Sequence, residues 1–260
     1  MNLLRAVTYN VHGWRGRGGG EPDVTRAVEV VRELHADVVG MQEVSLPRKV
    51  DVPSLEAYLA AATGMQVIFG PTLVCEEASY GNLLLVRRPL LEVRRHELSQ
   101  TACEPRGAIE ALLEVGADEP LRVITTHLGL SARERNSQIE RLMEILNSGS
   151  VGFVVLLGDF NVWLPWRTPT SAFDRWFGRS PRAPTFPAAF PIMCLDRIWV
   201  RPGWRLGALR VHRTPQARSA SDHLPMEAVV RCHKESRPLP VVSGQQDRRL
   251  GLTAGGRGRE

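Results

Sequence analysis

The sequence lacks any long hydrophobic run. No apolar stretch approaches the roughly 20 residues that a membrane-spanning helix needs. The chain also opens without the apolar core or the small-residue cleavage site of a signal peptide, and Leu3–Tyr9 has the pattern of a strand instead. We therefore expect a cytoplasmic protein.

Cysteine and lysine are both scarce. The four cysteines, Cys75, Cys103, Cys194 and Cys232, are scattered and form no CxxC pair, which argues against a zinc knuckle or a disulfide framework. Only two of the 33 basic residues are lysines, and the rest are arginines. Because such a bias can follow genomic base composition, the net charge of +5 is weak evidence for a nucleic-acid partner.

The length and composition suit one globular domain. A chain of 260 residues with 43% hydrophobic residues can bury a sizeable core, and we place the domain at residues 1–232. Residues 233–260 are rich in Gly, Arg, Gln and Pro without periodicity, so we expect a disordered basic tail there. We see no internal repeat, and we expect a monomer.

Short apolar, strand-like runs outnumber helical patterns. The predicted strands are Leu3–Tyr9, Asp37–Met41, Met65–Phe69, Asn82–Val86, Ala108–Val115, Leu121–Thr126, Gly152–Leu157, Cys194–Val200 and Leu224–Arg231. Helices are predicted at Asp23–His35, Ser54–Thr63 and Ser131–Asn147, where Ser131 and Glu134 have the spacing of a capping box. Helices lying between groups of strands predict two packed sheets with helices outside.

Polar residues recur beside these strand-like runs. They are Asn10, His12, Glu43, Asn82, Arg106, His127, Asp159, Asn161, Asp196, Asp222 and His223. Each alone has an ordinary explanation: Glu43 suits a surface acid, and His127 suits a satisfied core histidine. Their shared position at strand ends instead indicates a site at the rim of a sheet, where side chains are held rigidly and still reach solvent.

An ordered series of short motifs carries a family resemblance. The motifs are Thr8–Gly13, Gln42-Glu43, Tyr80–Asn82, Pro105–Gly107, Thr126–Leu128, Gly158–Asn161, Leu195–Ile198 and Ser221–His223. This series, which runs through residues 3–231, resembles the endonuclease/exonuclease/phosphatase (DNase I-like) superfamily, and its opening looks like that of small bacterial metal-dependent hydrolases. The resemblance implies an α/β fold: a four-layered α/β sandwich with two central mixed β-sheets flanked by helices.

The resemblance also implies a metal site and a base. Glu43 would bind Mg²⁺ or Mn²⁺, hard cations that prefer oxygen ligands, and Asn10 and Asp222 would complete or support that site. Asp159 would orient and deprotonate the attacking water, and Asn161 would hold that water or a phosphoryl oxygen. The reaction would be hydrolysis of a phosphoester without a covalent intermediate.

The remaining residues would act on the phosphoryl group and on the catalytic groups. His127 and His223 would donate hydrogen bonds to the non-bridging oxygens. Asp196 would accept a hydrogen bond from the far nitrogen of His223 and fix its tautomer. Asn82, Arg106 and His12 would contact phosphate or support the catalytic acids.

The substrate is left open among three alternatives. Abasic-site nucleases of this superfamily carry an aspartate at the position of His12 and a tyrosine at that of His127, so the sequence points to the DNase I, sphingomyelinase and phosphatase branches. The leading interpretation is a phosphodiesterase for a small or lipid-linked phosphodiester. A non-specific nuclease acting on nucleic acid is the second, and a catalytically silent binding module is the third.

An insert after Asn161 gathers aromatic and apolar residues. They are Trp163, Leu164, Trp166, Phe173, Trp176, Phe177, Phe186 and Phe190. We expect an ordered, proline-rich loop with one short helix that caps the core. Base stacking, receipt of a lipid, and peripheral membrane contact are the alternatives for this cluster.

Overall fold

The computed structural model describes residues 3–47, 54–116, 119–149, 152–163 and 170–232. The tail expected at residues 233–260 lies outside the described residues. Its disorder, and the placement of a single domain at residues 1–232, therefore stay predictions.

In the described part of the chain, eleven strands form two mixed β-sheets. The six-stranded sheet has the order β10 (Leu206–Val211), β11 (Met226–Arg231), β1 (Leu3–Asn10), β2 (Val38–Pro47), β4 (Ala78–Val86) and β3 (Gln66–Val74). The five-stranded sheet has the order β5 (Leu90–Glu97), β6 (Gly107–Leu113), β7 (Leu121–His127), β8 (Phe153–Asp159) and β9 (Asp196–Arg201). Only β1–β2 and β7–β8 pair in parallel, and the other described neighbours are antiparallel.

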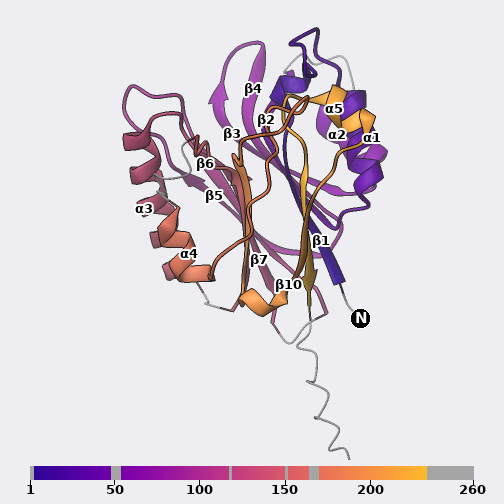
Figure 1. Cartoon of the computed structure of the whole chain (residues 1–260). Coiled ribbons are helices and arrows are strands. Elements are labelled where there is room, and N and C mark those ends of the chain that lie inside the picture. Colours follow the sequence, from indigo (N-terminus) through magenta and orange to yellow (C-terminus); the bar gives the residue numbers. More distant parts are fainter. Residues whose placement is uncertain (1–2, 48–53, 117–118, 150–151, 164–169, 233–260) are drawn as a thin grey trace, which may run out of the picture.

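The two sheets pack face to face between two helical layers (Figure 1). Helices α1 (Val24–Leu34), α2 (Leu55–Thr63) and α5 (Pro215–Ala220) pack on the outside of the six-stranded sheet, and α3 (Ala132–Ser148) and α4 (Ser171–Phe177) on the outside of the other. Apolar side chains from both sheets, including Ala6, Val38, Leu84, Val123 and Val155, fill the space between them. The predicted four-layered sandwich is confirmed.

Local sequence signals set where the helices begin. Asp23 accepts a hydrogen bond from the amide of Thr25 at the start of α1, and Ser54 accepts one from Ala57 at the start of α2. The Ser131 side chain accepts one from the amide of Glu134, as its spacing predicts. Each bond satisfies an amide that has no partner inside the helix, so the three predicted helices begin within a residue of their expected positions.

Two strands and one helix were not predicted. Strands β5 and β10 lie at the edges of their sheets, with β5 largely exposed and β10 half-buried, so neither shows the apolar run that marks a buried strand. Helix α5 has only six residues, too few to show helical periodicity, although Thr214 caps it and Pro215 begins it. The short helix expected in the insert is present as α4.

Several predicted strand ends were wrong by a few residues. Strand β2 continues beyond Met41 through a register shift to Pro47, and β4 begins at Ala78 rather than Asn82. Strand β11 begins at Met226, two residues later than expected. In β2 and β4, polar residues interrupt the apolar pattern while pairing with the neighbouring strand continues.

Strand register brings the polar strand ends to one rim. Asn10 pairs with Gln42 across the parallel β1–β2 pair, and His127 pairs with Asp159 across the parallel β7–β8 pair. Asp159 pairs on its other side with Asp196, the first residue of β9. The ends of both sheets therefore present their polar side chains at the same edge of the sandwich.

Candidate active site

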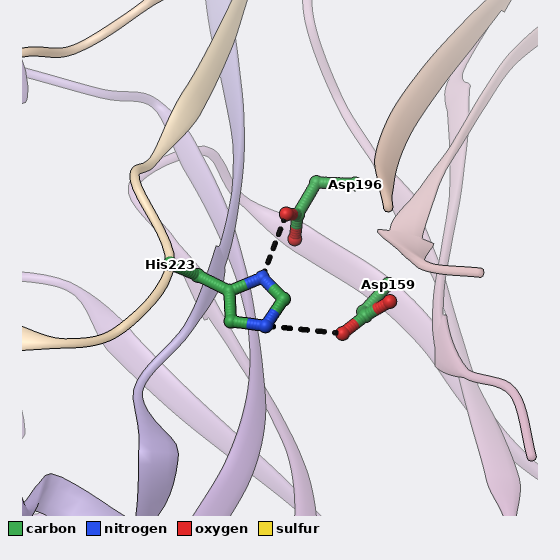
Figure 2. A group of neighbouring side chains, drawn as sticks. All are labelled: Asp159, Asp196 and His223. Atoms are coloured by element: carbon green, nitrogen blue, oxygen red, sulfur yellow. Dashed lines mark hydrogen bonds and ion pairs between the residues drawn. The ribbon is translucent and has the colours of Figure 1, made fainter. Parts of the chain in front are cut away.

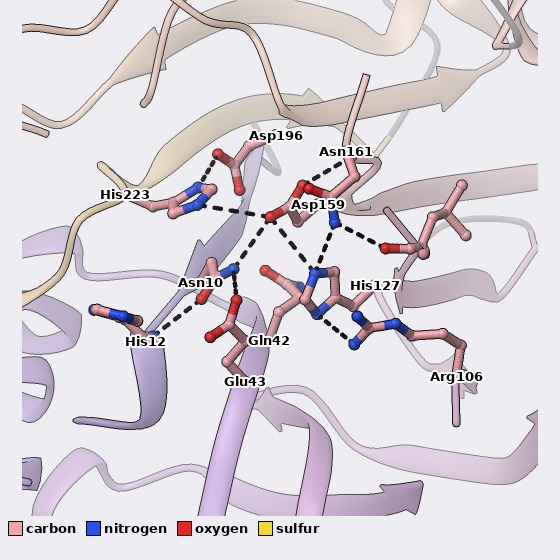
Figure 3. A network of polar contacts seen from close by, with 12 residues as sticks. Asn10, His12, Gln42, Glu43, Arg106, His127, Asp159, Asn161, Asp196 and His223 are labelled. Atoms are coloured by element: carbon pink, nitrogen blue, oxygen red, sulfur yellow. Dashed lines mark hydrogen bonds and ion pairs between the residues drawn. The ribbon is translucent and has the colours of Figure 1, made fainter. Parts of the chain in front are cut away.

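The carboxylate of Asp159 lies at the centre of this rim (Figure 3). Its Oδ1 accepts a hydrogen bond from the backbone amide of Asn161 at 2.9 Å, and its Oδ2 accepts one from the side-chain amide of Asn10 at 3.1 Å. The same Oδ2 lies 3.7 Å from Nε2 of both His127 and His223. Asp159 is buried, so one carboxylate oxygen is held between two imidazole rings and a side-chain amide.

Close backbone packing holds the Asp159 strand end in place. A Cβ atom at the preceding Gly158 would lie 2.1 Å from the carbonyl oxygen of Thr126 on β7. Only glycine fits there without a shift of the backbone. Because β7 also carries His127, this contact fixes the distance between the two site residues.

His223 forms a buried pair with Asp196 (Figure 2). His223 Nδ1 lies 2.9 Å from Asp196 Oδ2, and the hydroxyl of Thr185 donates to that same oxygen at 2.5 Å. Burial opposes a charged ring, but the nearby carboxylates, Asp196 first among them, raise the pKa of His223 to about 10. The ring is therefore an imidazolium at neutral pH, with Nε2 directed at Asp159.

His127 has the opposite protonation state. Burial lowers the pKa of His127 to about 3, and the positive charge of Arg106 adds to this effect, while Asp159 opposes it. The Arg106 guanidinium lies 3.3 Å from His127 Nδ1, and the side-chain nitrogen of Asn161 lies 3.0 Å from His127 Nε2. Both neighbours are donors, whereas a neutral imidazole has one acceptor. Donors therefore outnumber acceptors around this ring.

Glu43 contacts Asn10 directly, and Asp222 lies beside His12, which contacts Asn10. Asn10 Nδ2 donates to Glu43 Oε1 at 2.8 Å, and Glu43 lies at the register shift of β2 with a positive φ of 57°. The Asn10 side-chain oxygen accepts from the amide of His12 at 3.0 Å, and His12 Nδ1 lies 3.6 Å from Asp222 Oδ1. The rim thus gathers two carboxylates, one amide oxygen and one imidazole.

Asn82 and Arg106 line a small recess next to His127. The recess is bounded by Thr72, Tyr80, Gly81, Asn82, Arg106 and His127. Asn82 donates its side-chain amide to the carbonyl of Gly107 at 2.9 Å. It therefore supports the start of β6, and in the described part of the chain it forms no hydrogen bond with a carboxylate of the rim.

Two groups of side chains have the chemistry of a metal site. The ligand atoms of Asp159, Asp196 and His223 lie within 4.8 Å of one another, a spacing that could hold a metal ion (Figure 2). The protonated ring of His223, however, has no free lone pair and repels a cation. The group of Glu43, Asp222 and the amide oxygen of Asn10 offers hard oxygen donors, which fit Mg²⁺ or Mn²⁺ better.

Several residues of the site had no predicted role. Gln42 is buried beneath the site between the hydroxyls of Thr8 and Thr125, and Ser221 donates its hydroxyl to the carbonyl of Asn10. Tyr80 hydrogen-bonds to Glu43, and burial with the Glu43 charge raises the pKa of Tyr80 well above its usual value. Gln42, Tyr80 and Ser221 lie inside the sequence motifs, so those motifs carried a signal for them.

The aromatic insert divides into a buried and an exposed part. Phe173 is buried and packs edge-on against Phe160, and Phe177 is buried too, so the expected core cap is present. Phe186 packs at a tilt against the His223 ring with centroids 4.8 Å apart, and Trp163 packs edge-on against Phe186 at 5.5 Å. Phe190 remains 76% exposed. Leu164 and Trp166 lie outside the described residues.

Comparison with known proteins agrees with this fold. The model of the Endonuclease/Exonuclease/phosphatase family matches residues 7–223. The chain belongs to this family of hydrolytic enzymes, as the motif series predicted.

One curated relative covers nearly the whole length. The protein YbhP of Escherichia coli (strain K12), described as uncharacterized, is 30% identical over 245 residues, which span 87% of this chain and 96% of YbhP.

Solved structures share the fold at lower identity. An endonuclease/exonuclease/phosphatase from Beutenbergia cavernae superimposes with a TM-score of 0.73 at 23% identity, covering 90% of this chain and 72% of that chain. D. rerio TDP2, complexed with a single strand DNA product, does so with a TM-score of 0.62 at 15% identity, covering 88% and 99%. At these identities the likeness shows the fold alone. Among the described helices, none is long and apolar enough to cross a membrane.

Proposed function

We propose that this protein is a divalent-metal-dependent phosphodiesterase that hydrolyses its substrate by in-line attack of water on phosphorus. The observation that carries the proposal is the position of Asp159, whose Oδ2 lies 3.7 Å from Nε2 of two histidines in opposite protonation states. A base beside one charged and one neutral donor suits a reaction in which water loses a proton while phosphoryl oxygens gain negative charge.

Asp159 acts as the base in this proposal. The backbone amide of Asn161 and the side-chain amide of Asn10 each donate to one of its oxygens and keep the carboxylate in one orientation. A water molecule hydrogen-bonded to Oδ2 would face the phosphorus atom at a fixed angle, which reduces the entropy lost on reaching the transition state. No side-chain nucleophile is needed, since water attacks directly.

The surplus of donors around His127 suits the phosphoryl oxygens. The His223 imidazolium supplies a charged donor, and Asn161 and Arg106 add donors that the neutral His127 ring does not fully use. A phosphoryl oxygen provides an acceptor for these donors, and for Arg106 it would take the place of the Glu104 carboxylate. Such preformed donors stabilise the charge that develops in the transition state without reorganisation.

Glu43, Asp222 and Asn10 would hold the divalent cation. A bound Mg²⁺ or Mn²⁺ supplies neutralisation of the phosphoryl charge and stabilisation of the leaving oxygen. Asn10 links this group to the base, because its Nδ2 donates to both Glu43 and Asp159. His12, beside Asp222, contributes to binding of the phosphoryl group or orients that carboxylate.

The apolar side of the site favours a small or lipid-linked phosphodiester. Phe186 and Trp163 form a continuous aromatic contact with the His223 ring, and Phe190 and Ile192 of the same loop are 76% and 62% exposed. An apolar group esterified to the phosphate gains favourable contacts on such a surface. Because these apolar side chains are exposed, peripheral contact with a membrane is also part of this proposal.

A nuclease is the second candidate. Trp163, 39% exposed, offers a ring on which a base can stack, and TDP2, a protein of the same fold, has been seen with a single strand DNA product. A nuclease of this kind binds through phosphate contacts, so its affinity falls steeply with salt. Substrate binding that persists at high ionic strength contradicts this alternative.

Two chromogenic esters test the proposed reaction. Hydrolysis of bis(p-nitrophenyl) phosphate and p-nitrophenyl phosphate is measured with Mg²⁺, with Mn²⁺ and with chelator. We expect metal-dependent cleavage of the diester. Cleavage of the monoester alone contradicts the diesterase and favours a phosphatase. Tight binding of phosphoesters without any turnover instead favours a catalytically silent binding module.

A further inference from the structure

The Arg106 guanidinium is buried and incompletely satisfied. Only 6% of its side chain is exposed, and one of its terminal nitrogens lies 3.3 Å from His127 Nδ1. Within the described residues, its Nε has no hydrogen-bond partner. Arginine carries five N–H donors and no acceptor, so a buried guanidinium of this kind attracts an anion.

The acidic partner of Arg106 approaches from the solvent side. Glu104 accepts hydrogen bonds from both terminal nitrogens of Arg106, at 3.1 Å and 3.0 Å, and its own side chain is 47% exposed. Glu104 precedes Arg106 by two residues and lies in the irregular segment that leads into β6. The carboxylate therefore covers the open side of a guanidinium whose other side faces the catalytic histidine.

A phosphoryl group would bind the Arg106 guanidinium in the same way as the Glu104 carboxylate does. A guanidinium binds carboxylate and phosphate through the same two parallel N–H···O bonds. Although Arg106 is buried, the Glu104 carboxylate is half exposed, so water screens its charge and its side chain loses entropy in the pair. The Glu104 carboxylate is therefore readily exchanged for a more highly charged anion.

We propose that Glu104 is an internal competitor for an anion-binding subsite formed by Arg106 beside His127. In the free protein, Glu104 occupies the guanidinium. A substrate that carries a phosphoryl dianion next to the reacting phosphate displaces Glu104, which swings into solvent. The subsite thus selects substrates with a second phosphate or a terminal phosphate. This selection rests on the proposed function, but the binding event itself does not.

Binding of inorganic phosphate tests the subsite without turnover. Calorimetric titration with sodium phosphate is carried out in chelator at constant ionic strength on the whole chain, for the natural protein and for Glu104→Gln. We expect Glu104→Gln to bind phosphate more tightly by about fivefold, the factor that corresponds to losing a weak, partly screened competitor.

Two controls separate this effect from a general change in charge. Glu97→Gln removes one negative charge from the end of β5. In the described part of the chain, the Glu97 side chain accepts a single hydrogen bond, from the backbone amide of Ser99. Arg106→Lys keeps the positive charge and removes the two-pronged donor, and we expect no gain from Glu104→Gln in that background. Thermal unfolding verifies that each variant is folded.

The outcomes distinguish the proposal from its alternatives. Tighter binding in Glu104→Gln that is absent in Glu97→Gln and lost with Arg106→Lys supports the subsite. Equal phosphate affinity in Glu104→Gln and Glu97→Gln overturns it, as does a gain that persists with Arg106→Lys. Because no hydrolysis is measured, a failure of the phosphodiesterase proposal would leave this result intact.

Discussion

Asp196 Oδ2 lies 2.9 Å from His223 Nδ1, and both side chains are buried at the rim where the two sheets meet. The pair directs the other ring nitrogen at Asp159. A carboxylate in this position fixes the tautomer and favours the charged form of the ring. The protonation state of the proposed phosphoryl donor therefore depends on a residue that need not touch substrate.

Replacing Asp196 is expected to lower turnover strongly. In Asp196→Asn the amide no longer stabilises an imidazolium, so we expect kcat for a phosphodiester to fall by about 10²- to 10⁴-fold. Thr185→Val removes only the hydroxyl that donates to Asp196 and should cost about 10-fold or less. Steady-state kinetics of the two variants provide the measurement. Equal losses of kcat in the two variants would contradict the proposal that the Asp196 carboxylate keeps the His223 ring charged.

Replacing Glu43 is expected to weaken metal binding rather than folding. Glu43→Gln loses the charge that would bind the cation, so the Mg²⁺ concentration for half-maximal activity should rise by at least about tenfold. Glu92→Gln, on the exposed strand β5, is the matched control and should leave the titration unchanged. A magnesium titration of Glu43→Gln that coincides with that of the natural protein would exclude Glu43 as a ligand.

A second buried acid, Glu110, is expected to govern stability in acid. Burial opposes its charge, but hydrogen bonds from His96 and Arg122 lower the pKa of Glu110 to about 2. A lowered pKa contributes stability that is complete above the unfolded value of 4.5 and is lost as pH falls towards 2. The free energy of unfolding, measured with urea between pH 6 and pH 2, should therefore fall less steeply in Glu110→Gln than in the natural protein.

At neutral pH the same Glu110→Gln variant should be less stable than the natural protein. It leaves the buried Arg122 guanidinium without its charged partner, which costs about 3 kcal/mol. Parallel unfolding curves for the two proteins across the acid range would contradict the assignment of this ion pair.

The insert is expected to be part of the core. Phe173 is fully buried against Phe160 and Trp199, so Phe173→Ala should reduce the free energy of unfolding by about 3–5 kcal/mol. Phe190→Ala, at an exposed position of the same insert, should change it by less than about 0.5 kcal/mol. Chemical denaturation measures both. Similar small effects would mean that the insert folds independently of the core.

The sequence predicted those features that local pattern encodes. Buried strands such as β8 carry continuous apolar runs, and the polar residues that end them, such as Asp159, stand in recognisable motifs. Strands β5 and β10 escaped prediction because edge strands are half exposed, and their pairing partners rather than their own composition define them.

Contacts made through the insert could not be predicted. Thr185 and Phe186 reach Asp196 and His223 because the chain returns through a bridge between Phe186 and Met193, which no periodic pattern announces. The ionic states of the histidines were equally hidden. They depend on how deeply each ring is buried and on which charges lie beside it, both of which only the fold determines.

The most direct test of the central claim is hydrolysis of bis(p-nitrophenyl) phosphate with Mg²⁺ by the natural protein and by Asp159→Asn. Asp174→Asn is the control, since Asp174 lies on α4 and accepts a hydrogen bond from the Trp199 indole, which has no role in the proposed reaction. We predict metal-dependent cleavage that Asp159→Asn reduces by about 10²-fold or more, with folding retained. Cleavage by Asp159→Asn at the rate of the control would contradict the assignment of Asp159 as the base.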